Sequence, residues 1–136
     1  MNTFKDATTE EINVIMEQSW GAFEAYRTFS LQQRAGFMHA IATALGSISE
    51  AVVAAAMKET HLPEPRLNNE LTRTIFQLNS YADACKQGNW IEARIDTAIT
   101  ERNPPKPDLR KMLVPLGPVV VFGASNFPFA YSTAGG

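Results

Sequence analysis

The sequence predicts an α/β fold in which a helical first half precedes an extended, hairpin-like arm and then one strand of a buried parallel sheet. Three observations carry this prediction. Residues 8–87 show helix-capping patterns and apolar residues at helical spacing, residues 90–114 form extended runs, and residues 119–122 are continuously apolar. The sheet is incomplete in these residues, because a parallel strand needs neighbouring strands.

Capping boxes mark the starts of three helices. In each box a Ser or Thr stands three residues before a Glu or Gln, so each side chain can accept a hydrogen bond from the free backbone N–H of the other residue. Apolar side chains then recur at helical spacing, which predicts one apolar face for each helix. The three boxes are Thr8 with Glu11, Ser30 with Gln33, and Ser47 with Glu50.

A fourth helix is expected to open near Pro65 and to run through Gln87. Gly88 suits the position after its last turn, and Gly46 suits the end of the second helix, because glycine adopts positive φ without a Cβ clash. The apolar stripe of the fourth helix consists of Leu67, Leu71, Ile75, Leu78, Ala82 and Cys85. We therefore expect Cys85 to be a buried structural thiol and not a nucleophile, since an apolar site disfavours the thiolate.

Two extended segments follow the helices. In Trp90–Asp96, apolar side chains alternate with charged ones, which is the period of a half-buried strand. Residues 103–107 contain three prolines and predict a loop, because proline cannot donate to a strand ladder. Leu109–Val114 is the second extended segment, so the two segments together predict a hairpin.

A polar turn, Gly123–Asn126, follows the expected buried strand Val119–Phe122. In α/β folds, ligands gather at the carboxyl ends of strands, which is the position of this turn. Gly123 and Ala124 keep the loop thin, so a ligand could come close to the backbone. Asn126 can donate to an oxygen that gains negative charge, a contribution worth ~10²–10³ in rate. The alternative is that Asn126 closes an Asx-type turn or caps the next helix.

Composition and charge argue against several classes of partner. The 136 residues carry a formal net charge of −2 and the basic residues do not cluster, so neither nucleic acid nor a membrane is an expected partner. The chain has no apolar run near the ~20 residues that span a bilayer and no secretory signal, and its single cysteine fits a reducing compartment. We expect a cytoplasmic protein. His39 and His61 lack neighbouring ligands, so no metal site is expected.

The last segment of the chain resembles a known family. The residues "PLGPVVVFGASNFPFAYSTAGG", Pro115–Gly136, are similar without gaps to the P-x-G-x-V…N-F-P segment of the aldehyde dehydrogenase superfamily, and the preceding pattern extends the similarity over most of the chain. Many members have Pro-Trp-Asn-Phe-Pro where this chain has Ala-Ser-Asn-Phe-Pro at residues 124–128. The "FGASNFP" variant resembles the branch of 2,5-dioxopentanoate (α-ketoglutarate semialdehyde) dehydrogenases, and some NADP-preferring fatty aldehyde dehydrogenases.

The resemblance implies a mechanism and a cofactor, NAD or NADP. In the family, a cysteine thiolate attacks the aldehyde, the thiohemiacetal passes a hydride to NAD(P)+, and water activated by a glutamate releases the acid. Asn126 matches the asparagine that donates to the thiohemiacetal oxygen. Gly123, Ala124, Ser125 and Asn126 match the loop along the nicotinamide side of the cofactor, where Ser125 replaces a bulky tryptophan.

The resemblance also implies that residues 1–136 are the N-terminal part of an NAD(P)-binding aldehyde dehydrogenase. Helices would occupy residues 8–87 and arm strands residues 90–114, and residues 118–136 would begin a Rossmann-like cofactor domain. The family's catalytic cysteine and glutamate lie beyond the matched segment, so this fragment is expected to be inactive alone.

The expected partners are an aldehyde substrate and further copies of the chain. In the family, segments equivalent to residues 90–114 build an arm that pairs with another subunit, which implies a dimer or tetramer. A hairpin that pairs only within the chain is the alternative. For the function as a whole, the alternative is a small helical interaction module without enzymatic activity.

Overall fold

The computed structural model describes residues 5–133, and the chain divides into two compact units. One unit consists of Met1–Phe29 with Pro115–Val120, and the other consists of Ser30–Val114 with Val121–Gly136. The second unit holds most of the helices, the arm and the turn at residues 123–126.

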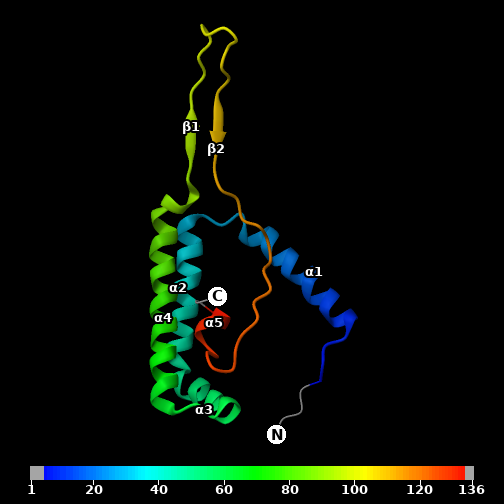
Figure 1. Cartoon of the computed structure of the whole chain (residues 1–136), viewed down its shortest axis with the longest axis vertical. Helices are drawn as coiled ribbons and strands as arrows, with labels where there is room; N and C mark the ends of the chain where they lie inside the picture. Colours follow the sequence, from blue (N-terminus) through cyan, green and yellow to red (C-terminus); the bar gives the residue numbers. More distant parts are fainter. Residues whose placement is uncertain (1–4, 134–136) are drawn as a thin grey trace. The chain divides into compact units, whose positions relative to one another are not determined.

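Three helices build the core of the larger unit: α2 (Leu31–Ser47), α3 (Ser49–Thr60) and α4 (Glu64–Gln87). Helices α2 and α4 run antiparallel side by side, and α3 packs against α4 (Figure 1). The stripe expected on the fourth helix lines this core, because its members are buried or partly buried. One cluster joins Leu67 and Leu71 of α4 to Val53 and Ala56 of α3, and another joins Leu78 to Ala42 of α2.

Two of the three expected capping boxes are confirmed. Thr8 and Glu11 exchange hydrogen bonds at the start of α1 (Thr9–Tyr26), and Ser30 and Gln33 do so at the start of α2. The third box is wrong. Ser47 is the last residue of α2 and its hydroxyl donates to the Ala44 carbonyl at 2.8 Å, so it cannot cap α3.

Of the two helix ends predicted at glycines, one is confirmed. Gly88 is the C-cap of α4 with φ of 75°, as predicted. Gly46 does not end α2, because the helix continues through Ser47 and leaves a single residue, Ile48, before α3. His61 takes the left-handed conformation after α3 with φ of 58°.

The arm is a two-stranded antiparallel hairpin that projects beyond the ends of α2 and α4 (Figure 1). Its strands are β1 (Arg94–Asp96) and β2 (Leu109–Lys111), with Ile95 opposite Arg110, and the 3₁₀ turn η1 (Asn89–Ile91) precedes β1. The hairpin is confirmed, but the half-buried strand is wrong because Ile95 is 70% exposed. No other described element covers either face of the two strands. The apolar side chains that alternate with charged ones are therefore left exposed.

Charged side chains form polar contacts in the distal part of the arm. Lys106 forms an ion pair with Asp96 across the hairpin. Near the tip, the Thr100 hydroxyl donates to the Glu101 carboxylate at 2.7 Å, and this bond holds the pKa of Glu101 below its usual value. Polar contacts of this kind keep an extended hairpin compatible with water.

The smaller unit contains α1 and residues 115–120, and no residue of α1 is buried. The expected apolar face is present in sequence, yet Ile12, Met16 and Trp20 are 49%, 44% and 54% exposed. A Cβ on Gly117 would lie 3.4 Å from the Trp20 ring, which places the chain directly against that side chain.

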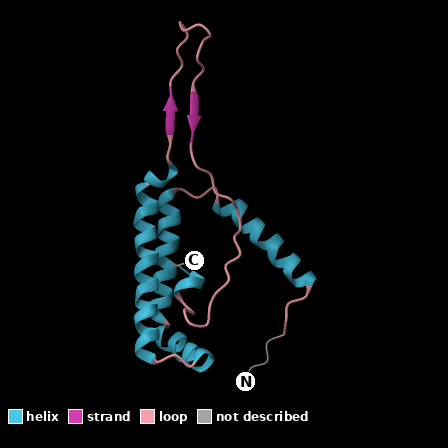
Figure 2. Ribbon diagram, viewed as in Figure 1, coloured by secondary structure: helices cyan, strands magenta, loops and turns pink. Residues whose placement is uncertain are grey.

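The buried strand expected at Val119–Phe122 is not found among the described residues. Residues 112–123 form loop (Figure 2), and the side chains of Val119 and Phe122 are 71% and 88% exposed. A strand buried on both faces needs paired neighbours and helices over it, and the described residues supply no neighbouring strand. The Rossmann-like part of the expected α/β fold is therefore not confirmed, and the described residues are mostly helical.

Replacing Gly88 by alanine should lower the free energy of unfolding by about 1–2 kcal/mol, since a residue with a Cβ is strained in the left-handed conformation. The new Cβ would also lie 3.0 Å from Leu31 Cδ1. Gly36→Ala is the matched control: its Cβ would meet nothing within 4 Å in the interior of α2, so it should stabilise by roughly 0.5–1 kcal/mol. Urea unfolding followed by circular dichroism measures both. Equal stability of the two variants would contradict the cap assignment.

Candidate functional site

The turn at residues 123–126 lies against α4 and leads into the short helix α5 (Ala130–Thr133). The Phe127 N–H donates to the Ala124 carbonyl at 3.0 Å, which closes the turn through the backbone. Ser125 and Asn126 occupy its corner and are exposed, whereas Ala124 is partly buried. Pro128 follows, and its ring fixes the backbone on the way to α5.

Neither structural role considered for Asn126 is used. The turn is closed by the backbone bond between Phe127 and Ala124, and the start of α5 is bonded to Glu70. Among residues 5–133, the Asn126 carboxamide has no hydrogen-bond partner, and its exposed side chain is free to meet another molecule. The carboxamide is therefore available for the donor role.

Arg66 of α4 anchors the turn at Asn126. Its guanidinium donates to the Asn126 backbone carbonyl and lies over the Phe127 ring, 4.7 Å from the ring centroid. The Phe127 ring in turn stacks on Tyr131 of α5, with centroids 5.0 Å apart. A cation held over an aromatic face is attracted by the ring quadrupole, so the same side chain fixes the turn in two ways.

Glu70 of α4 holds the next part of the segment. Its Oε1 accepts hydrogen bonds from the N–H groups of Phe129 at 2.9 Å and Ala130 at 3.0 Å. These groups lie at the start of α5, where backbone donors lack partners within the helix. Glu70 is 5% exposed, and within the described part of the chain its Oε2 is buried without a partner.

Sequence reasoning missed Arg66 and Glu70, although a signal for Glu70 was present. Glu70 stands three residues after Leu67 and next to Leu71, so helical spacing places it on the apolar stripe of α4. A carboxylate on a buried face must find hydrogen-bond donors. The sequence could have indicated that need, but not the donors, which lie 59 and 60 residues away.

Gly123 lies close to a side chain of α5. A Cβ at this position would lie 2.5 Å from the Ser132 Oγ of α5, a distance that real Cβ atoms do not show. The sequence predicts that the loop is open to a ligand at Gly123. On the Gly123 side, α5 of the same chain lies against the loop instead. A ligand would have to approach from the exposed Ser125 and Asn126.

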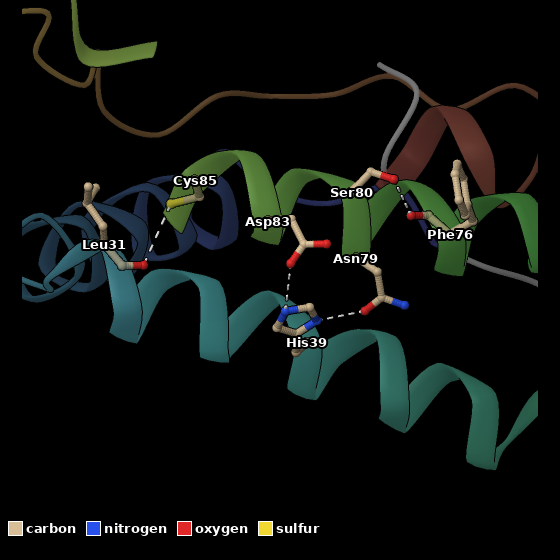
Figure 3. Close-up of polar contacts among 7 residues, drawn as sticks. All are labelled: Leu31, His39, Phe76, Asn79, Ser80, Asp83 and Cys85. Carbon is tan, nitrogen blue, oxygen red and sulfur yellow. Dashed lines mark hydrogen bonds and ion pairs between the residues drawn. The ribbon is translucent and has the colours of Figure 1, made fainter. Parts of the chain in front are cut away.

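Cys85 and His39 bridge α2 and α4 away from the turn (Figure 3). Cys85 is buried, and its thiol Sγ lies 3.9 Å from the Leu31 carbonyl oxygen, so the expected structural thiol is confirmed in position. His39 Nδ1 lies 2.8 Å from Asn79 Oδ1, and its Nε2 lies 3.7 Å from Asp83 Oδ1. These contacts join two helices and bring no metal-binding set together.

Residues 5–133 contain neither a cluster of metal ligands nor a single helix that could span a membrane. Within this range, no group of three or more His, Cys, Asp or Glu is placed to hold a metal ion. No single helix in it is long and apolar enough to cross a membrane. Helices α2 and α3 reach that length and composition only as a pair, and they are bent by 72° at their junction.

The sequence of the chain matches the model of one enzyme family over almost its full length. The model of the aldehyde dehydrogenase family matches residues 1–135. The chain belongs to the aldehyde dehydrogenase family.

Two relatives refine this comparison. The chain is 42% identical over 134 residues to the alpha-ketoglutaric semialdehyde dehydrogenase of Acinetobacter baylyi. It is 44% identical over 134 residues to alpha-ketoglutaric semialdehyde dehydrogenase 2 of Azospirillum brasilense. Each match covers 98% of this chain and 26% of the relative, so the chain spans about a quarter of the length of these relatives.

The burial of Cys85 predicts a protected thiol with a structural role. In the folded chain it should react with a thiol reagent much more slowly than in urea, because the reagent must reach a buried sulfur. Cys85→Ser should lower the free energy of unfolding by about 1–3 kcal/mol, the usual cost of placing a hydroxyl in an apolar site. Equal reaction rates in the native and unfolded chain would contradict this assignment.

Proposed function

We propose that the protein oxidises an aldehyde to a carboxylate with NAD(P)+, and that Asn126 donates a hydrogen bond to the aldehyde oxygen as it gains negative charge. The observation that carries this proposal is the exposed Asn126 carboxamide, which sits on a turn anchored to α4 and has no partner among the described residues. Membership of the aldehyde dehydrogenase family supports an enzyme over a non-enzymatic interaction module.

The chemistry of a carboxamide suits this role. Its N–H is a neutral donor, so it stays available at every working pH and does not exchange protons with the substrate. A donor that is already in place needs no reorganisation when the charge develops, which is why such groups are worth ~10²–10³ in rate.

The remaining catalytic groups are proposed to lie elsewhere in a longer enzyme. The single cysteine of these 136 residues is buried in the helical core, where it cannot reach a substrate. The two relatives are about four times as long as the matched segment. We therefore propose that residues 1–136 are the N-terminal part and are inactive without the family's cysteine and glutamate.

Residues 123–126 are proposed to lie along the nicotinamide side of NAD or NADP. Ser125 and Asn126 are exposed and uncharged, and no described side chain covers the corner of the turn. When bound, the cofactor would accept the hydride from the substrate carbon. On this chain, Ser125 and Asn126 would contact it, while Gly123 and Ala124 would shape the backbone behind them.

The proposed substrate is 2,5-dioxopentanoate. Support comes from the names of the two relatives, both alpha-ketoglutaric semialdehyde dehydrogenases, and from the "FGASNFP" residues at 122–128. A cytoplasmic location is proposed from the single cysteine, a free thiol, which fits a reducing compartment.

The arm is proposed to pair with another copy of the chain in a homo-oligomer. Its strands pair with each other and leave their outer edges without a partner among the described residues. Ile95 and Leu109 are 70% and 53% exposed on this hairpin. Unpaired strand edges with apolar side chains are templates for pairing with another chain.

In the complete enzyme, Asn126→Ala should lower kcat by about 10²–10³-fold, as for other oxyanion donors. The assay is steady-state turnover of 2,5-dioxopentanoate and of simple aldehydes, with NAD+ and with NADP+. Asn68→Ala, which removes an exposed carboxamide from α4, is the matched control and should change kcat far less. Turnover near the wild-type rate in Asn126→Ala would refute the donor role, and no turnover of any aldehyde by the wild-type enzyme would refute the activity.

Ile95→Lys in the complete enzyme should shift the assembly toward smaller species, because a charged side chain would have to be buried in the proposed contact. Thr72→Lys, on an exposed position of α4, is the control and should leave the assembly unchanged. Light scattering after size-exclusion chromatography gives the mass of each variant. A wild-type mass for Ile95→Lys would argue that the arm pairs only within its own chain.

A further inference from the structure

Among the described residues of the larger unit, Glu70 carries a buried carboxyl group that the proposed chemistry does not use. We infer that Glu70 is a positioning residue for Asn126: its carboxylate ties the backbone of Phe129 and Ala130 to α4, and this tie holds the Asn126 carboxamide in register for the substrate oxygen. The inference rests on the proposed function and adds a residue that never touches the substrate.

The first support is that Glu70 has few alternatives to these bonds. Its side chain is 5% exposed and lies between Leu67 and Thr74, which are both fully buried on the same face of α4. Water therefore does not compete for Oε1, and the Phe129 and Ala130 N–H groups are its described donors. Breaking these bonds would leave two backbone N–H groups and a buried carboxyl oxygen without a partner, which is costly, so the segment is held firmly.

The second support is the complementary use of Arg66. Arg66 and Glu70 are four residues apart, a spacing at which opposite charges on a helix can pair with each other. In the described structure they form no ion pair; Arg66 takes the Asn126 carbonyl, and Glu70 takes the N–H groups of residues 129 and 130. The two side chains thus bind backbone groups of opposite polarity on one short segment.

The third support is the short and stiff connection from this anchor to Asn126. Only Phe127 and Pro128 separate Asn126 from Phe129, and the proline ring fixes one backbone angle between them. Phe129 also packs against the cluster of Leu67 and Leu71, so the tie and the core move together. A displacement at residue 129 is therefore transmitted to Asn126, and a misplacement of 1 Å can cost about 10²-fold in rate.

A double-mutant cycle in the complete enzyme separates this role from simple stabilisation. Glu70→Ala should lower kcat by roughly 10- to 10²-fold while the KM for the aldehyde changes little. Glu70→Gln should recover most of that loss, because its amide oxygen can still accept both N–H groups. In the Asn126→Ala background, Glu70→Ala should lower kcat by less than about twofold, since the group that it positions is already absent.

Two results of this cycle would overturn the inference. If Glu70→Ala leaves kcat unchanged, or lowers it equally in both backgrounds, Glu70 does not act through Asn126. If Asn126→Ala alone has normal turnover, the oxyanion role itself fails, and that single variant identifies this case. Glu59→Ala, an exposed glutamate on α3, is the control for loss of one carboxylate and should be normal.

A second readout is independent of turnover and covers the case in which Glu70→Ala does not fold. Glu70→Asp keeps the charge but withdraws the oxygens by one methylene, and the same cycle is then run with it. Hydrogen exchange of the peptide containing Phe129 and Ala130 should speed up in Glu70→Asp and stay slow in Glu70→Gln. Equal protection in wild type and Glu70→Asp would overturn the tie.

Discussion

The arrangement of the candidate turn depends on one buried carboxylate, that of Glu70. A carboxylate inside a protein is costly unless its oxygens accept hydrogen bonds, and the first N–H groups of a helix are costly to bury unless they find acceptors. Oε1 of Glu70 is the acceptor that the start of α5 lacks, and the two N–H groups satisfy this oxygen, while Oε2 is buried without a partner in the described part of the chain. Because Glu70 projects from the stripe of α4 that packs on α2 and α3, the turn inherits its position from the helical core.

In residues 123–133, backbone polar groups and the Asn126 side chain have different roles. The backbone groups at Asn126, Phe129 and Ala130 are used to hold the segment on α4, while the side chain of Asn126 stays exposed. In such a site the segment is held by backbone hydrogen bonds, so the side-chain donor of Asn126 stays unpaired within the described structure and can bind another molecule. Rigid support of a short functional loop by a helix is the usual way in which proteins position such groups.

Local chemistry made much of the fold predictable. The capping pairs at Thr8 and Ser30, the glycine cap at Gly88 and the hairpin each depend on neighbours within a few residues or on a proline-rich loop. The prediction failed at Ser47, where the competing acceptor was a carbonyl three residues earlier, and at Val119–Phe122, whose burial depends on strands that the described residues do not supply. The turn itself was predictable, but its anchors were not, since their partners are about 60 residues distant in sequence.

The exposed run Val119–Phe122 has a consequence for the behaviour of these residues in solution. Four consecutive apolar residues with high β-propensity and no charge have the composition of cross-β segments, but such segments are six or seven residues long. Pro118 at one end and Gly123 at the other act as gatekeepers, because both weaken an extended ladder. The same residues that suit the interior of a sheet are thus too short, and too well bounded, to template such a stack on their own.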